Sequence, residues 1–171
     1  MANYVAFLRG VNVGGRIIKM ADLRACFEKV GFGDVKTILQ TGNVIFESDK
    51  DEVELKQQIE KLLAKTYNYP AKVQVLSLDK LSEIVAANPF AGAPKDYHQY
   101  VIFMENELEA PLIAEAGKLL EEQVKLGQGV VYWEVQKGMS LKSKFAKLLT
   151  KTKYKEFNTV RNINTLQKIL A

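Results

Sequence analysis

The chain has 171 residues, 47% hydrophobic and 26% charged, which is long enough to fold around its own core without disulfides or bound metal. Its one cysteine, Cys26, excludes an internal disulfide. Because the N-terminus lacks a signal-peptide pattern and no apolar run is long enough to span a membrane, we expect a cytoplasmic protein. The net charge of +4 is unevenly distributed: residues 137–171 carry a charge of +8 and the preceding 136 residues a charge of −4. This basic C-terminal segment either meets an anionic partner or forms a solvated surface.

The first 77 residues predict one βαββαβ unit. Hydrophobic periodicity places strands at residues 3–8, 35–40, 43–48 and 71–76, with helices after the first and third of them. Only Thr41-Gly42 separates the middle two strands, which is typical of a tight hairpin whose Gly supplies a positive φ. Asp49 and Glu52 have the spacing of a capping box for the second helix. This order predicts a ferredoxin-like unit, an antiparallel sheet with two helices on one face.

Residues 78–97 predict a helix capped by Ser77 and then a linker with Gly92 and Pro94. From residue 98 to residue 171 we expect a second unit with strands at 99–104, 123–126 and 130–135 and helices near 112–121, 143–150 and 165–170. The sequence therefore predicts an α+β protein of two ferredoxin-like, βαββαβ-type halves with antiparallel sheets. The second half lacks its last strand in this prediction and ends in basic C-terminal helices.

The topology of the first half brings two polar loops to one edge of its sheet. Residues 9–16 follow the first strand and residues 40–43 join the second and third, and we call these two segments the rim. Glycines can turn backbone N–H groups toward an anion, and the basic side chains supply charge. The candidate ligand-binding residues here are Arg9, Gly10, Asn12, Gly14, Gly15, Arg16, Lys19, Gln40, Thr41 and Asn43. The alternative is structural: glycines that only permit positive φ, and polar side chains that only bridge loop backbones.

The rim differs from known phosphate and metal motifs. Its glycine spacing resembles a P-loop, but Arg16 stands where that motif has Lys and Ile17 where it has a hydroxyl residue, so no P-loop is predicted. The rim contains no Asp or Glu. We therefore predict no metal site, no cofactor and no paired-carboxylate catalysis there.

Neither the chain's two reactive residue types nor its βαββαβ order predicts a functional site by itself. Cys26 falls on the apolar stripe of the first helix, where we expect a buried, inert thiol. His98, the one histidine, stands at the edge of the linker with no predicted catalytic partner. RNA-recognition domains share the βαββαβ order but expose paired aromatic residues on strands one and three, whereas Tyr4 and Phe46 are expected in the core.

Three stretches form a recognisable set: residues 8–15 with the following Lys19-Met20, residues 37–46, and residues 159–165. Together they resemble the signatures of the bacterial Domain of Unknown Function 1697 family, over nearly the whole chain. The resemblance implies two ferredoxin-like subdomains and no particular activity, since the family has none assigned. The third stretch adds Arg161, Asn162 and Asn164 to the candidate ligand-binding residues.

Three functions remain open from the sequence. The first is a module that binds a phosphate-bearing ligand, a nucleotide or nucleic acid, through the rim and the third stretch. The second is an enzyme in which the rim stabilises developing negative charge, although no base or nucleophile is evident. The third is a structural or dimerising protein whose polar motifs hold the chain together, and the residues leave its oligomeric state open.

Overall fold

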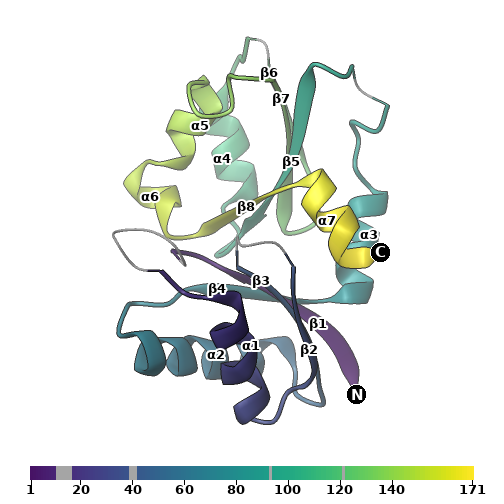
Figure 1. Ribbon diagram of the computed structural model, residues 1–171. Helices are drawn as coiled ribbons and strands as arrows, with labels where there is room; N and C mark the ends of the chain where they lie inside the picture. Colours follow the sequence, from purple (N-terminus) through teal and green to yellow (C-terminus); the bar gives the residue numbers. More distant parts are fainter. Residues whose placement is uncertain (11–16, 39–41, 93, 121) are drawn as a thin grey trace. The chain divides into compact units, whose positions relative to one another are not determined.

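The computed structural model describes residues 1–10, 17–38, 42–92, 94–120 and 122–171, which divide into two units (Figure 1). The first comprises residues 1–82 with 168–171, and the second comprises residues 83–167. Each unit contains one four-stranded antiparallel sheet, so the predicted α+β class is confirmed. None of the described helices is both long enough and apolar enough to cross a membrane.

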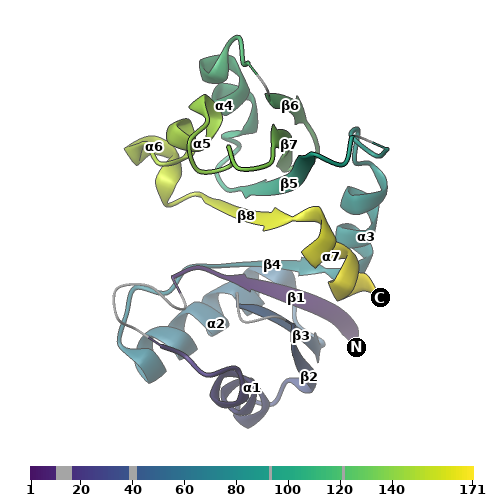
Figure 2. The same ribbon diagram turned by 45° about the horizontal axis from the view of Figure 1, so that its top comes forward.

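The first unit has the predicted ferredoxin-like order. Its elements are β1 (Ala2–Leu8), α1 (Met20–Lys29), β2 (Gly33–Ile38), β3 (Asn43–Ser48), α2 (Glu52–Tyr67) and β4 (Val73–Ser77). The strands lie in the order β2-β3-β1-β4, and every neighbouring pair is antiparallel. Helices α1 and α2 cover one face of this sheet (Figures 1 and 2).

An aromatic cluster fills the space between this sheet and its helices. The ring of Phe46 on β3 is fully buried and lies 4.7 Å from the ring centroid of Phe32, 5.7 Å from that of Phe27 and 5.9 Å from that of Tyr4. Aromatic pairs at these separations add to the free energy gained from burying their apolar surface. Tyr4 and Phe46 therefore belong to the core, as predicted, and do not form an RNA-stacking surface.

The start of α2 differs from the prediction. Asp51, and not Asp49, is the N-cap: its Oδ1 accepts a hydrogen bond from the Glu54 N–H at 2.9 Å, and the Asp51 N–H donates to Glu54 Oε2. Asp49 instead pairs with the N-terminal ammonium group at 3.3 Å on the surface. Both aspartates are residues of a type that can cap a helix. The helix begins after Asp51 because both hydrogen bonds of the capping box form between Asp51 and Glu54.

The second unit repeats the same architecture. Its elements, including the helix that enters it, are α3 (Leu78–Ala86), β5 (Tyr97–Met104), α4 (Glu109–Ala116), β6 (Glu122–Leu126), β7 (Val130–Gln136), α5 (Lys144–Leu149), α6 (Thr152–Lys155), β8 (Asn158–Asn162) and α7 (Ile163–Leu170). Ser77 caps α3 as predicted, since its Oγ accepts from the Lys80 N–H. The sheet order is β6-β7-β5-β8, again antiparallel throughout.

The expectation that the second half lacks its last strand is wrong. Residues 158–162 form β8, which pairs with β5 from Met104↔Asn158 to Tyr100↔Asn162 and completes the four-stranded sheet. The reason lies in its composition. The strand reads Asn-Thr-Val-Arg-Asn, with a single strongly apolar residue, so it shows no hydrophobic alternation. As an edge strand it is held by main-chain pairing to β5, which places few demands on its side chains.

A buried carboxylate organises the core of the second unit. Glu122 is 7% exposed, and its two oxygens accept hydrogen bonds from the Trp133 indole N–H at 2.9 Å and from the Phe145 backbone N–H at 3.3 Å. The indole in turn packs against the rings of Tyr100 and Phe145. Glu122 thus links β6, β7 and the start of α5 with both of its oxygens bonded, as a buried carboxylate requires.

Candidate functional site

The described ends of the two rim loops meet at one edge of the first sheet. The Leu8 N–H at the end of β1 donates to the carbonyl oxygen of Gly42 at 2.8 Å. The next N–H, that of Arg9, donates to the carbonyl oxygen of Lys72 at 3.1 Å. Main-chain bonds therefore hold the segment after β1 between the β2–β3 turn and the segment that leads into β4.

Only part of the predicted rim can be located. Asn12, Gly14, Gly15, Arg16, Gln40 and Thr41 lie outside the described residues. Gly10 has a φ of +68°, a left-handed conformation that favours glycine. Lys19 is exposed and immediately precedes α1. The described part of the rim thus brings Gly10 and the positive charge of Arg9 next to the segment that carries Lys72.

Asn43 has a structural role in this region. Its side chain is fully buried, and its Nδ2 donates to the carbonyl oxygen of Ile38 at 3.0 Å. The two residues also pair in the β2–β3 ladder, so this bond closes the hairpin from within. Asn43 therefore contributes to the shape of the rim through the backbone that it holds.

The candidates of the third stretch lie in the second unit. Arg161 pairs with Val101 in the sheet, and its Nη1 donates to the carbonyl oxygen of Val160 at 3.0 Å. Asn162, the last residue of β8, accepts a hydrogen bond from the Asn164 N–H on its Oδ1 at 2.8 Å. This is the bond of a helix N-cap, so Asn162 ends the strand and caps α7 without any intervening loop.

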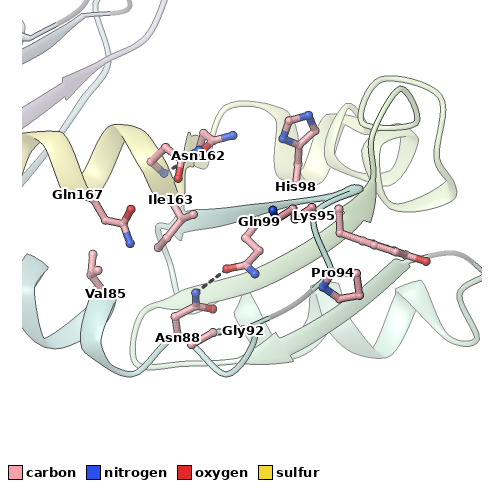
Figure 3. Close-up of a pocket in the computed structure, with 13 residues that line it drawn as sticks. Val85, Asn88, Gly92, Pro94, Lys95, His98, Gln99, Asn162, Ile163 and Gln167 are labelled. Carbon is pink, nitrogen blue, oxygen red and sulfur yellow. Dashed lines mark hydrogen bonds between the residues drawn. The ribbon is translucent and has the colours of Figure 1, made fainter.

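Asn162 and Asn164 line a cavity of about 360 Å³ within the second unit, which we call the amide pocket (Figure 3). The pocket is open to solvent and is formed by the end of α3, the segment that follows it, the start of β5 and the first turns of α7. The described residues that line it are Val85, Asn88, Ala91, Gly92, Pro94, Lys95, Tyr97, His98, Gln99, Asn162, Ile163, Asn164 and Gln167. Five of these side chains are carboxamides, and Arg161 is not among the lining residues.

Two of the carboxamides form a fixed floor. Asn88 Nδ2 donates to Gln99 Oε1 at 2.8 Å, the bond drawn in Figure 3. Gln99 Nε2 donates to the carbonyl oxygen of Phe90 at 2.7 Å, and the Phe90 N–H donates back to Asn88 Oδ1 at 3.1 Å. This closed ring of bonds joins β5 to the chain after α3. It fixes which atoms of Asn88 and Gln99 remain for a ligand, since each amide keeps one N–H outside the ring.

The wall provided by α7 is more adaptable. Asn164 and Gln167 are three residues apart on one helix face, and both are exposed. Figure 3 shows the amide of Gln167 directed toward Val85 of α3, with His98 at the other end of the pocket. Because α7 begins at Ile163, the positive end of its dipole lies at the pocket, where it favours negative charge.

The electrostatics of the pocket are positive to neutral. Lys95 and His98 line the pocket together with the carboxamides, and no Asp or Glu is among the described lining residues. The nearest carboxylate in the sheet ladder is Glu134, which pairs directly with Gln99 and is 7% exposed. Burial raises the pKa of Glu134, and the charge of Lys125 opposes that shift, so this carboxyl favours its neutral form more than an exposed one does.

Most of the described side chains that line the pocket can form hydrogen bonds. Its described lining contains no Ser, Thr, Cys, Asp or Glu, so it offers Tyr97 and His98 as its titratable side chains other than Lys95. Within the part of the chain that the structure describes, no group of three or more His, Cys, Asp and Glu side chains is placed to hold a metal ion. Carboxamides, by contrast, present a donor and an acceptor side by side and suit polar ligands of fixed shape.

Two of the predicted ligand-binding residues, Asn162 and Asn164, line the amide pocket, and the sequence gives no motif for the other residues of its lining. Asn88 and Gln99 give no motif, because they meet only through the path of the chain after α3. His98 was assigned to the edge of the linker, whereas it is the second residue of β5 and lines the cavity. The available sequence signal for the pocket was the polar run of residues 95–99, between the Gly-Pro linker and the first strand of the second half.

Cys26 departs from the expectation of a buried thiol. It is half-buried on α1, and its Sγ lies 3.6 Å from the Thr66 hydroxyl on α2. The position on the first helix agrees with the prediction, but the apolar stripe is narrower and excludes it, with Leu23 and Phe27 as the buried residues of α1. The thiol joins two helices at the edge of the core.

Comparisons with known proteins give a family and a fold. The sequence model of a family described as "Protein of unknown function (DUF1697)" matches residues 1–132. A conserved bacterial protein, SP0830 from Streptococcus pneumoniae, is similar in structure, with a TM-score of 0.82 and 24% identity over 98% of this chain and 96% of that one. The small subunit of acetolactate synthase from Thermotoga maritima aligns over 95% and 97% of the two chains at 14% identity, but its TM-score of 0.25 supports no conclusion. No curated protein matches the sequence.

Proposed function

The chain belongs to the DUF1697 family of proteins of unknown function, and we propose from its site that it binds a small phosphate-bearing ligand, such as a nucleotide, in the amide pocket. The observation that carries this proposal is a cavity of about 360 Å³ lined by five carboxamides, a lysine and a histidine, with no carboxylate among its described lining residues. A cavity of this size lies within the range of small-ligand sites.

The phosphate is assigned to the α7 end of the pocket. The positive end of the helix dipole, Lys95 and the donors of Asn164 and Gln167 all favour a negatively charged group. The fixed Asn88–Gln99 pair suits the other part of the ligand. Its remaining amide groups can bond to a nucleobase edge or a sugar hydroxyl in a set orientation, because the ring of bonds to Phe90 prevents the amides from rotating.

The rim is a second location for the same ligand class. Its support is the meeting of the segments of Arg9 and Lys72, which are tied together by the bonds from Leu8 and Arg9, with Lys19 at the start of α1 as a further positive charge. A longer anion, such as a nucleic acid strand, would draw on the lysines of the C-terminal segment, and its affinity would then fall steeply with salt.

Binding can be tested by equilibrium dialysis of the full chain with inorganic phosphate, ATP and a short single-stranded RNA. The pocket variant is Asn164→Leu with Gln167→Leu, which changes two exposed amides and leaves the core intact. We expect it to lose roughly tenfold in ATP affinity, as two hydrogen bonds to a ligand would predict. The matched control is Asn3→Leu with Gln57→Leu, two exposed amides of the first unit.

The outcome against the proposal is clear. If none of the three probes binds saturably to the parent chain, or if the pocket variant binds ATP as well as the control does, the pocket is not a phosphate-ligand site. A rim variant, Arg9→Ala with Lys19→Ala, separates the two locations. Loss of ATP binding in this variant alone would assign the ligand to the rim.

A further inference from the structure

A second cavity of the second unit, of about 290 Å³, shares no lining residue with the amide pocket. It opens between the described residues 118–120 and 122, before and at the start of β6, and residues 139–144, before and at the start of α5. Its apolar lining residues are Leu120, Val135 and Met139. We call this cavity the apolar groove.

Large apolar side chains at the groove are exposed to solvent. Leu120, on one side, is 78% exposed. Leu141 is 90% exposed and stands between the lining residues Met139 and Lys142 on the other side. Single exposed leucines are common on protein surfaces. Here Leu120 lines the cavity and Leu141 belongs to a segment that borders it, and such a grouping gives a partner protein an apolar surface to contact.

The border of the groove is basic. Lys118 lies on one segment and Lys142 and Lys144 on the other. In the described part of the chain none of the three pairs with a carboxylate, and Lys144 Nζ donates only to the Lys118 carbonyl oxygen, at 3.3 Å. The lysines Lys151 and Lys153 differ, because both pair with Glu115 at 3.1 Å.

Among the described lining residues of the groove the one acid, Glu122, does not offset this charge at its border. Glu122 is 7% exposed, and its two oxygens already accept from the Trp133 indole and the Phe145 N–H. It forms a fixed part of the floor. A ligand in the groove therefore meets apolar walls and, on both bordering segments, lysines that form no ion pair with a described carboxylate.

We propose that the apolar groove docks a segment of a partner protein in which an apolar side chain is flanked on both sides by Asp or Glu. The concave apolar surface would take the apolar side chain, and lysines on both bordering segments would meet the two acidic flanks. Such charge complementarity accelerates association and selects the partner. The groove also favours a peptide over a membrane surface, because a cavity between two segments fits a single protruding side chain.

The test is selection from a display library of random peptides of about twelve residues on the full chain. Peptides that also bind the groove variant Leu120→Asp with Lys142→Glu are discarded. Both changes are on exposed side chains, so the variant should fold, which its melting temperature verifies. The matched control is Val53→Asp with Lys61→Glu on α2, where Val53 is 67% exposed.

We expect the selected peptides to share an apolar residue with acids on both sides. Fluorescein-labelled copies should bind the parent and the control equally and the groove variant at least roughly tenfold more weakly. The proposal fails if no selected peptide depends on Leu120 and Lys142, or if those that do lack acids. It also fails if the groove instead mediates binding to vesicles of phosphatidylcholine and phosphatidylserine at about 3:1, the membrane alternative. None of these readouts involves phosphate binding, so the two proposals stand or fall separately.

Discussion

The phenol of Tyr154 donates a 2.6 Å hydrogen bond to Glu115 Oε2, joining α6 to α4. Tyr154 is 1% exposed, whereas Lys151 and Lys153, the other partners of Glu115, lie largely in solvent. The hydrogen bond from Tyr154 is the largest of the effects that lower the pKa of Glu115 to about 2, ahead of the two lysines. In the opposite direction, burial and the bond to Glu115 raise the pKa of Tyr154 to about 12.

This pair predicts a specific dependence of stability on acid. The folded pKa of Glu115 is below its ordinary value of 4.5, so its contribution is complete above about pH 4.5 and is lost as the pH falls toward about 2. Glu115→Gln should therefore melt at a lower temperature than the parent at neutral pH, and the difference should shrink across that interval. Circular dichroism melts at a series of pH values would measure it. Exposed Glu83→Gln is the control, and a difference from the parent that stays constant down to pH 2 would contradict the prediction.

Substitution of the buried Glu122 should lower the free energy of unfolding at neutral pH. Glu122→Ala leaves the Trp133 indole and the Phe145 N–H without their acceptor in a buried site. Two such bonds to a charged group predict a fall of about 3 kcal/mol in the free energy of unfolding, and Glu122→Gln, which keeps one acceptor, about 1 kcal/mol. Urea titration followed by the fluorescence of Trp133, the chain's one tryptophan, reports the change directly. Equal stability of the Ala and Gln variants would argue against this role.

The two aspartates before α2 form a matched pair. Asp51→Ala removes the hydrogen bond that the Asp51 carboxylate accepts from the Glu54 N–H and should cost about 1 kcal/mol. Asp49→Ala removes only an exposed ion pair with the N-terminus and should change stability by less than about 0.5 kcal/mol. Urea unfolding of the two variants in parallel compares them. The order of the two effects reverses if the helix begins at the earlier residue.

Asn43 separates a structural role in the rim from a binding role. Asn43→Ala deprives the Ile38 carbonyl oxygen of its buried donor and should lower the free energy of unfolding by about 1 to 3 kcal/mol. Because Asn43 does not line the amide pocket, ATP affinity measured well below the melting temperature should stay within about twofold of the parent. Exposed Asn3→Ala serves as the control. A loss of ATP affinity without a loss of stability would make Asn43 a ligand contact.

Much of the fold could be predicted from periodicity, and the exceptions have local causes. The first unit follows from its apolar strands and helix stripes, since residues such as Phe46 are both hydrophobic and correctly spaced. Strand β8 was not predicted from the sequence, because its pairing with β5 relies on main-chain bonds and most of its side chains are polar. The shift of the α2 cap from Asp49 to Asp51 reflects two equivalent residue types whose choice depends on the return bond from Glu54.

The candidate site was predictable only where its residues are adjacent in sequence. Asn162 and Asn164 stand together in one motif, and the strand-to-helix junction explains why. Asn88 and Gln99 are eleven residues apart across a linker, and their contact depends on where Phe90 turns the chain. Hydrophobic patterns do not encode such a polar contact, because the residues that form it carry no period.

The direct passage from β8 into α7 also sets a rule for chain length. One extra residue after Asn162 would rotate every later side chain of α7 by about 100° around the helix axis. Asn164 and Gln167 would then turn away from the cavity even though no amide had been changed. A surface loop can accept an insertion without changing its neighbours, but an insertion at this junction would replace the side chains that form the cavity wall. Relatives with one residue more or fewer here should therefore present a different set of side chains to the cavity.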